Sequence, residues 1–146
     1  MERKEFIHLF GMGAAAVLAS GCLGGCASKD PDPAPGPPPV VTQVDFTLDL
    51  MAPENAALHD PARGYVYGAN KQVIVVKTAA GGYAALQAPC PHQGTTIVFE
   101  SGPSQFVCPN HGSVFTLDGT VVTGPANRAL RRYTATQTGN LLRVTS

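Results

Sequence analysis

Two short stretches, Cys90-Pro91-His92-Gln93-Gly94 and Cys108-Pro109-Asn110-His111-Gly112-Ser113, decide the fold of this chain. Each carries one thiol and one imidazole, spaced C-x-H in the first and C-x-x-H in the second. Proline interrupts strand pairing and glycine tolerates unusual backbone angles, so both stretches are expected to be turns that point side chains toward each other. The converging side chains predict a soft metal site with four ligands: Cys90, His92, Cys108 and His111.

The composition favours a single domain made of short strands. The chain has 146 residues, with 16 Gly and 13 Pro, which favours turns over long helices. The formal net charge is zero, so no nucleic-acid partner is indicated. Two of the four cysteines lie near the N-terminus and two in the paired stretches, so a metal site there leaves no thiol in the domain for a disulfide.

Residues 1–21 are expected to be a bacterial lipoprotein signal peptide rather than part of the fold. A basic start precedes a short apolar run from Leu9 to Ala19, and the small residues directly before Cys22 resemble a lipobox. Cys22 is therefore expected to be lipidated and to become the mature N-terminus, with Cys26 as the alternative. A plain secretory signal with incidental cysteines is also open.

Residues 22–39 follow as a proline-rich linker without apolar periodicity. Such a sequence predicts an extended, semi-rigid tether, or a disordered terminus without function. A lipid anchor and a tether together would hold the domain at a membrane of the bacterial cell envelope, on its periplasmic or outer side.

Residues 40–146 are expected to form an all-β domain of about ten short antiparallel strands, with the metal loops at one end. No convincing helical period is found there, and Met51 to Pro61 is expected to be irregular. The expected strands cover Val44–Leu50, Gly64–Tyr67, Val73–Lys77, Tyr83–Gln87, Thr96–Phe99, Gln105–Val107, Ser113–Thr116, Thr120–Thr123, Leu130–Thr136 and Leu141–Val144.

The order of the four ligands bears on which metal they hold. A set of two cysteines and two histidines suits zinc, but common zinc fingers pair Cys with Cys and His with His, on a hairpin and a helix. The interleaved order here fits a dinuclear cluster better, because each loop can give one ligand to each iron. A structural zinc-binding module remains the alternative.

With these features the chain resembles the Rieske [2Fe–2S] proteins, whose two cluster-binding loops match the stretches that begin at Cys90 and Cys108. The resemblance covers roughly residues 44 to 144 and implies a Rieske-like antiparallel β sandwich or barrel, with a small cluster-binding subdomain formed by two loops. It also implies one [2Fe–2S] cluster per chain, with Cys90 and Cys108 on the buried iron and His92 and His111 on the outer iron. Further matches are Phe115, Asp118-Gly119, Gly124-Pro125-Ala126, Leu130 and Tyr133.

The resemblance also implies supporting residues around the cluster, namely Gly94, Gly112, Ser113, Phe115 and Pro125. High-potential respiratory Rieske proteins join the two loops by a disulfide, but this chain has Thr95 and Asn110 at those positions. Such proteins also place Ser and Tyr hydroxyls on the cluster; Ser113 keeps the first, whereas Phe115 replaces the second. Loss of a donor leaves the reduced cluster less stabilised, which predicts a low-to-intermediate potential within roughly −150 to +300 mV.

Two functions follow from this resemblance. The first is a stand-alone one-electron carrier in the cell envelope, lipid-anchored and working with redox protein partners. The alternative is the small electron-transfer subunit of a larger oxidoreductase, either arsenite-oxidase-like or of the cytochrome bc type; the missing disulfide argues against the bc type. Neither function gives the chain a catalytic residue or a substrate-converting site of its own. Arg128, Arg131 and Arg132 predict a basic docking face or a solvated strand edge.

Overall fold

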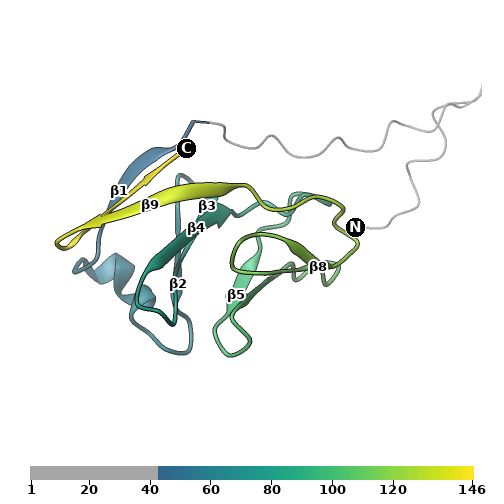
Figure 1. The fold of residues 1–146 in the computed structure, drawn as a ribbon, viewed down its shortest axis with the longest axis horizontal. Coiled ribbons are helices and arrows are strands. Elements are labelled where there is room, and N and C mark those ends of the chain that lie inside the picture. The colour runs from purple at the N-terminus through teal and green to yellow at the C-terminus, as the bar shows by residue number, and fades with distance from the viewer. Residues whose placement is uncertain (1–42) are drawn as a thin grey trace, which may run out of the picture. The chain divides into compact units, whose positions relative to one another are not determined.

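The computed structural model describes residues 43–146, and nearly all its regular structure is β-strand (Figure 1). The ten strands overlap the ten predicted ones, so the all-β prediction is confirmed. The predicted signal peptide, Cys22, Cys26 and the linker lie outside the described residues. The elements are β1 (Asp45–Asp49), η1 (Pro53–Leu58), β2 (Tyr65–Gly68), β3 (Val73–Lys77), β4 (Tyr83–Gln87), β5 (Val98–Glu100), β6 (Gln105–Val107), β7 (Val114–Phe115), β8 (Val121–Thr123), β9 (Arg132–Thr138) and β10 (Leu141–Thr145).

The segment predicted to be irregular contains the 3₁₀-helix η1, which differs from the expectation. Pro53 starts this helix, and the buried side chain of Asn55 donates from Nδ2 to the carbonyl of Asp49 at 2.8 Å. Leu58 closes the helix and is buried against the large sheet. Six residues of 3₁₀ structure are too short to give a periodic sequence pattern. Within residues 43–146 no helix has the length and apolar character needed to cross a membrane.

Six strands form one antiparallel sheet in the order β1-β10-β9-β4-β3-β2. This sheet curls until its two edge strands approach each other. A Cβ atom placed on Gly68 of β2 would lie 2.3 Å from the ring of Phe46 on β1. Glycine is therefore required where the Phe46 ring covers the β2 backbone, and the sheet takes the form of a partly closed barrel.

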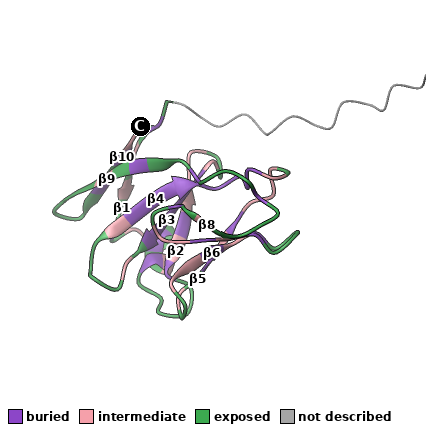
Figure 2. Ribbon diagram, turned by 45° about the vertical axis from the view of Figure 1, so that its right-hand side comes forward, coloured by how far each residue is buried: buried purple, intermediate pink, exposed green. Residues whose placement is uncertain are grey.

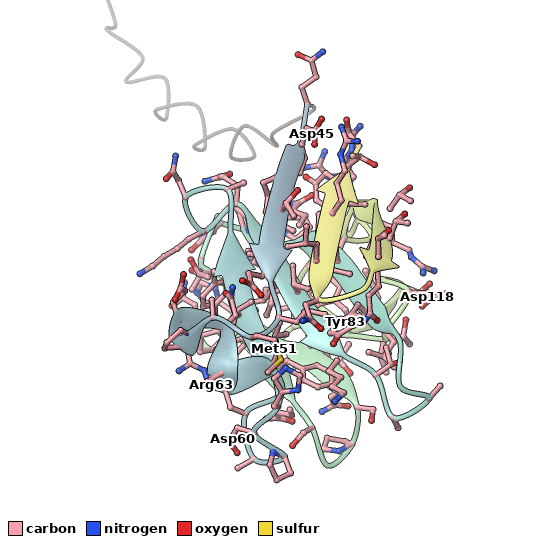
Figure 3. All side chains as sticks on the ribbon, turned by 90° about the vertical axis from the view of Figure 1, so that its left-hand side faces the viewer. Asp45, Met51, Asp60, Arg63, Tyr83 and Asp118 are labelled. Atoms are coloured by element: carbon pink, nitrogen blue, oxygen red, sulfur yellow. The ribbon has the colours of Figure 1, made fainter. Side chains whose placement is uncertain are left out.

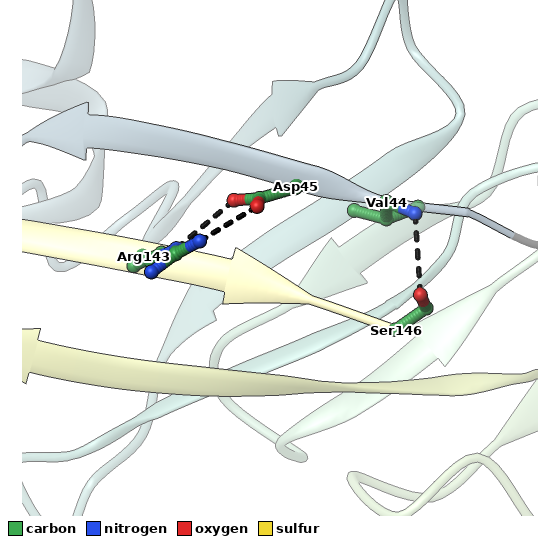
Figure 4. Close-up of polar contacts among 4 residues, drawn as sticks. All are labelled: Val44, Asp45, Arg143 and Ser146. Carbon is green, nitrogen blue, oxygen red and sulfur yellow. Dashed lines mark hydrogen bonds and ion pairs between the residues drawn. The ribbon is translucent and has the colours of Figure 1, made fainter.

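Polar contacts join β1 to β10 along one edge of this sheet (Figure 4). Arg143 donates from Nη2 and Nε to the carboxylate of Asp45 at 2.7 and 3.0 Å, and the N–H of Val44 donates to Ser146 Oγ at 3.4 Å. The hydrogen bond from Arg143 lowers the pKa of Asp45. The charges of Asp45 and Arg143 therefore cancel each other at this exposed edge of the sheet.

The remaining four strands form a smaller sheet in the order β5-β6-β7-β8. The segment from Ala88 to Ile97, which contains the first metal loop, connects β4 of the large sheet to β5, and the second metal loop connects β6 to β7. The small sheet therefore carries the predicted cluster-binding subdomain.

Strand β3, which is almost entirely buried (Figure 2), separates two apolar cores. Its residues Val73 and Val75 face the interior of the curled large sheet, whereas Ile74 and Val76 face the small sheet. All four side chains are fully buried, and burial stabilises by about 1.5–3 kcal/mol for each such side chain. The core between the sheets also contains Phe99, Phe106 and Phe115 and both cysteines, Cys90 and Cys108.

The strand registers of the large sheet define two ends of the molecule. Strand β1 begins at Asp45 and β4 ends at Gln87 at the same end, which we call the loop end because the first metal loop follows Gln87. The opposite end, called the far end, carries η1 and the turn between β3 and β4. Figure 3 shows Asp45 at one end and Met51, Asp60 and Arg63 at the other.

Candidate metal centre

The two metal loops adopt the same hydrogen-bonded turn. In each loop the cysteine N–H donates to the carbonyl five residues later, and the cysteine carbonyl accepts from the glycine N–H four residues later. This repeat holds although the histidine stands at different positions in the two loops. The bonds are Cys90 N–Thr95 O (2.8 Å), Gly94 N–Cys90 O (2.8 Å), Cys108 N–Ser113 O (2.8 Å) and Gly112 N–Cys108 O (2.9 Å).

A left-handed glycine closes each of these turns. Gly94 has φ +75° and Gly112 has φ +72°, a region that costs other L-residues about 1–2 kcal/mol. A Cβ atom on Gly112 would meet no atom within 4 Å. The backbone angle, and not the available space, is therefore what requires glycine at Gly112.

The two histidine rings come together at the surface of the loop end. His92 Nδ1 and His111 Nδ1 lie 3.2 Å apart, and the ring centroids are 4.8 Å apart at an interplanar angle of 84°. His92 is half-buried and His111 is exposed. Because the two Nδ1 atoms face each other, the Nε2 atom of each ring lies on the opposite side of its imidazole.

The two thiols lie below the rings, inside the core between the sheets. Cys90 and Cys108 are 0 % and 2 % exposed, and they are not joined to each other or to any described residue by a disulfide. Burial raises the pKa of the Cys90 thiol, and its contact with the Cys108 thiol raises it further, whereas the backbone N–H groups of His92 and Gln93 act in the opposite direction. These N–H donors supply partners for a thiolate, and a bound metal ion would hold the thiols deprotonated.

The four donors form two pairs, a buried thiol pair and a surface imidazole pair. Within residues 43–146, no three His, Cys, Asp or Glu side chains gather closely enough to hold one metal ion. A cluster of two irons needs two protein donors at each iron, and in the Rieske type these are thiolates at one iron and imidazoles at the other. The donor set therefore fits a [2Fe–2S] cluster.

The predicted supporting residues lie in the two loops or next to them in the structure. The buried Ser113 accepts the N–H of Ala126 at its Oγ, at 3.0 Å, which ties the Gly124-Pro125-Ala126 segment to the second loop. Pro125 is exposed beside this bond. Phe115 is completely buried in the same core as the two thiols.

Two residues that support the first loop were missed by the sequence analysis. The side chain of the buried Gln87 donates from Nε2 to the carbonyl of Pro89 at 2.6 Å, directly before Cys90. Tyr67 donates its hydroxyl to the carbonyl of Ile97 at 2.8 Å, where the loop segment ends. Burial is the main cause that raises the pKa of Tyr67 to about 12, so the phenol stays protonated and able to donate. For Gln87 the sequence held one weak indication, because this glutamine ends the otherwise apolar strand β4.

A cavity of about 390 Å³ lies elsewhere, at the far end. Leu58, His59 and Lys77 line it on the large-sheet side and Phe99, Ser101 and Ser104 on the other. His59 contacts the carbonyl of Leu50 through Nε2 at 3.0 Å and Lys77 Nζ through Nδ1 at 3.5 Å. His59 therefore lies outside the donor set.

A family model of the Rieske [2Fe-2S] domain matches residues 49–134. The chain belongs to the Rieske [2Fe–2S] family. Rieske proteins carry a [2Fe–2S] cluster for electron transfer, and the chain is therefore a one-electron transfer protein with this cofactor.

Relatives of this Rieske protein include iron-sulfur subunits of the cytochrome b6-f complex. The cytochrome b6-f complex iron-sulfur subunit of Prochlorococcus marinus (strain MIT 9312) is 30% identical over 146 aligned positions, covering 89% of this chain and 76% of that protein. The corresponding subunit of Chlorobaculum thiosulfatiphilum is 25% identical over 134 positions, covering 92% and 70%.

Two solved structures share the fold. The cyanobacterial plasma membrane Rieske protein from Synechocystis PCC 6803 is 29% identical, with a TM-score of 0.52 over 62% of this chain and 92% of that one. The ferredoxin of carbazole 1,9a-dioxygenase from Nocardioides aromaticivorans IC177, at 22% identity and a TM-score of 0.50, has the same fold over 70% of this chain and 96% of that one.

The backbone angle of Gly112 gives a prediction for loop stability. Gly112→Ala should destabilise the protein by about 1–2 kcal/mol, and Gly112→Asn by less, because asparagine tolerates the left-handed region better. Thermal unfolding followed by circular dichroism, together with loss of cluster absorbance, measures both variants. Gly102→Ala is the control, since this loop glycine has no positive φ and open space around it. A Gly112→Ala variant as stable as the parent chain would contradict the conclusion that the backbone angle requires glycine at this position.

Proposed function

We propose that Cys90 and Cys108 bind the inner iron of the cluster and His92 and His111 the outer iron, in an exported, lipid-anchored domain. In this proposal the domain spans residues 40–146 and passes single electrons between redox proteins at a membrane of the bacterial cell envelope. The observation that supports it is the separation of the donors into a buried thiol pair and a surface imidazole pair.

The residues of the chain have distinct tasks in this transfer. The bound cluster supplies a centre that gains or loses one electron. The backbone N–H groups of His92 and Gln93 stabilise negative charge on Cys90, and the core between the sheets keeps water from both thiols. The imidazole of His111 is exposed at the surface. A partner protein can therefore contact this ring directly, with no other side chain between the partner and the donor set.

A second candidate is a small electron-transfer subunit of a larger oxidoreductase. The observation that favours it is the similarity to cytochrome b6-f complex iron-sulfur subunits. Against the bc type stand Thr95 and Asn110, which occupy the positions of the two bridging cysteines of that class. We therefore propose the carrier first, and the loop sequences leave an arsenite-oxidase-like subunit as the alternative.

The proposed ligand set is tested by metal analysis. The purified full chain should be red-brown, contain two irons and two acid-labile sulfides, and give the EPR signal of mixed nitrogen and sulfur ligation when reduced. Cys90→Ser and His111→Ala should lose the cluster, whereas the control His59→Ala should keep it because His59 lies at the far end. A colourless protein with one zinc ion would refute the proposal.

The reduction potential tests the roles of Ser113 and Phe115. Phe115→Tyr should raise the potential and Ser113→Ala should lower it, because a hydroxyl donor stabilises the reduced state. A hydrogen bond to a charged group is worth about 1.5–3 kcal/mol, and a one-electron potential shifts by ~59 mV for each tenfold change in equilibrium constant, so shifts of about 60 mV or more are expected. Redox titration measures them. An unchanged potential in Phe115→Tyr would show that the hydroxyl does not reach the cluster, and a parent chain near +300 mV would contradict the low-to-intermediate class.

The lipid anchor is tested at the two N-terminal cysteines. Cys22→Ser should abolish incorporation of a labelled fatty acid and release the chain from the membrane fraction, whereas Cys26→Ser should leave both unchanged. The reverse result would assign the lipid to Cys26, and a parent chain that incorporates no labelled fatty acid would refute the anchor.

Mild detergent extraction of the parent chain from native membranes distinguishes the carrier from the subunit. A subunit would co-purify with a partner in fixed proportion, whereas a carrier would be extracted alone.

A further inference from the structure

The segment from Ala126 to Arg131 is held against both metal loops. At one end the N–H of Ala126 donates to Ser113 Oγ of the second loop at 3.0 Å. At the other end the N–H of Gln87 donates to the carbonyl of Arg131 at 2.8 Å, and the side chain of Gln87 donates to Pro89 at 2.6 Å. This segment therefore borders the donor set at the loop end.

Basic side chains are concentrated on this border. Arg128 and Arg132 are exposed, and Arg131 is exposed with its guanidinium over the ring of Tyr133 at 5.8 Å. A fourth cation comes from the turn between β2 and β3, where Lys71 is exposed and has φ 63°. The carbonyl of Gln72, next to Lys71, accepts the N–H of Ala88 at 2.9 Å, which places this turn beside the first loop. We call Lys71, Arg128, Arg131 and Arg132 the basic rim.

One carboxylate lies beside the rim. Gly119 accepts the N–H of Leu130 at its carbonyl, at 2.9 Å, which brings the neighbouring Asp118 close to the rim segment. The carboxylate of Asp118 is occupied by hydrogen bonds from Thr116 and Thr120. The basic rim thus has four basic side chains and one neighbouring carboxylate, which already accepts hydrogen bonds.

The other charges lie at the far end or cancel. Asp45 and Arg143 form an ion pair on β1 and β10. The far end carries more carboxylates than basic side chains: Asp49, Glu54, Asp60 and Glu100 against Arg63 and Lys77. Figure 3 shows Asp60 and Arg63 at the end opposite Asp45. The chain has a formal net charge of zero, yet the described domain has a charge dipole whose positive end lies beside the metal loops.

We propose that the basic rim docks redox partners whose own redox centre is surrounded by carboxylates. The inference rests on the proposed ligand set, because the rim matters for electron transfer only if the cluster lies between the two loops. Charges of this kind act over about 10 Å at 0.1 M salt, so they orient an approaching partner and raise the association rate more than the final affinity. An acidic partner would thus be turned so that its redox centre faces the exposed His111.

Small redox probes of opposite charge test the rim without knowledge of the partner. One electron passes from the reduced full chain, in neutral detergent, either to ferricyanide, which becomes ferrocyanide, or to tris(phenanthroline)cobalt(III), which becomes cobalt(II). Stopped-flow rates at ~10 mM salt are compared for the parent chain, Arg128→Gln/Arg132→Gln and the control Arg63→Gln/Lys77→Gln. Both variants lose two positive charges, but only the first loses them at the loop end.

The rim variant should react with ferricyanide about fivefold more slowly and with the cobalt complex faster, and the control should change by less than about twofold. A changed reduction potential would move both rates in the same sense, so opposite changes identify the rim's field. The differences should vanish at ~0.5 M salt. The proposal would be overturned if the two variants changed the rates equally, or if the rates did not depend on the charge of the probe. It would also be overturned if the rim variant bound anionic vesicles more weakly than the parent chain while its ferricyanide rate was unchanged.

Two further measurements distinguish a failure of the rim proposal from a failure of the double variant to fold or of the chain to bind its cluster. Lys71→Gln removes a rim charge outside the strands, so it replaces the double variant if that variant does not fold, with a smaller change in the same direction expected. Retention on a cation-exchange resin reports the rim independently of electron transfer, and the rim variant should elute at lower salt than the control. A chain without iron would refute the proposed function, whereas a loaded chain whose rates are insensitive to probe charge would refute the rim alone.

Discussion

Burial of the thiol pair of Cys90 and Cys108 between the two sheets is the constraint on which the rest of this structure depends. Two thiolates in an apolar core are unstable unless backbone N–H donors and metal ions compensate their charge. The repeated loop turn supplies the N–H donors, because it directs N–H groups of the first loop at Cys90. It also raises both histidines to the surface, so one backbone motif separates the soft donors inside from the imidazoles outside.

Hydrogen bonds from residues next to and beyond the two loops close them in place of a disulfide. The described cysteines are free, and Thr95 and Asn110 stand at the positions that carry the bridging cysteines in the respiratory class. Instead, Ser113 holds the Gly124-Pro125-Ala126 segment, and Gln87 holds the carbonyl that precedes Cys90. Each of these hydrogen bonds contributes about 1 kcal/mol, so closure depends on several weak contacts acting together.

The parts of the structure that local pattern specifies could be predicted from the sequence, and the parts that depend on distant contacts could not. Strands β3 and β4 follow from β-branched and apolar runs between turn residues, and their predicted bounds agree with the structure. The donor set stays a prediction from Cys and His at close spacing within two Pro/Gly turns, and the structure brings the two thiols and the two imidazoles together as pairs. By contrast, the contact of Phe46 with Gly68 and the bond from Tyr67 to Ile97 join distant segments, which no local pattern encodes.

Net charge is a poor guide to how this domain meets its partners. A formal charge of zero argued against nucleic acid, yet it conceals the separation of the basic rim from the carboxylates of the far end. Three of the four rim residues, Arg128, Arg131 and Arg132, follow the segment that Ser113 holds, so the contact that closes the second loop also places charge beside the donors. Closure of the metal loops and the direction of the charge dipole therefore arise from the same stretch of chain, and a change that frees the segment would weaken both.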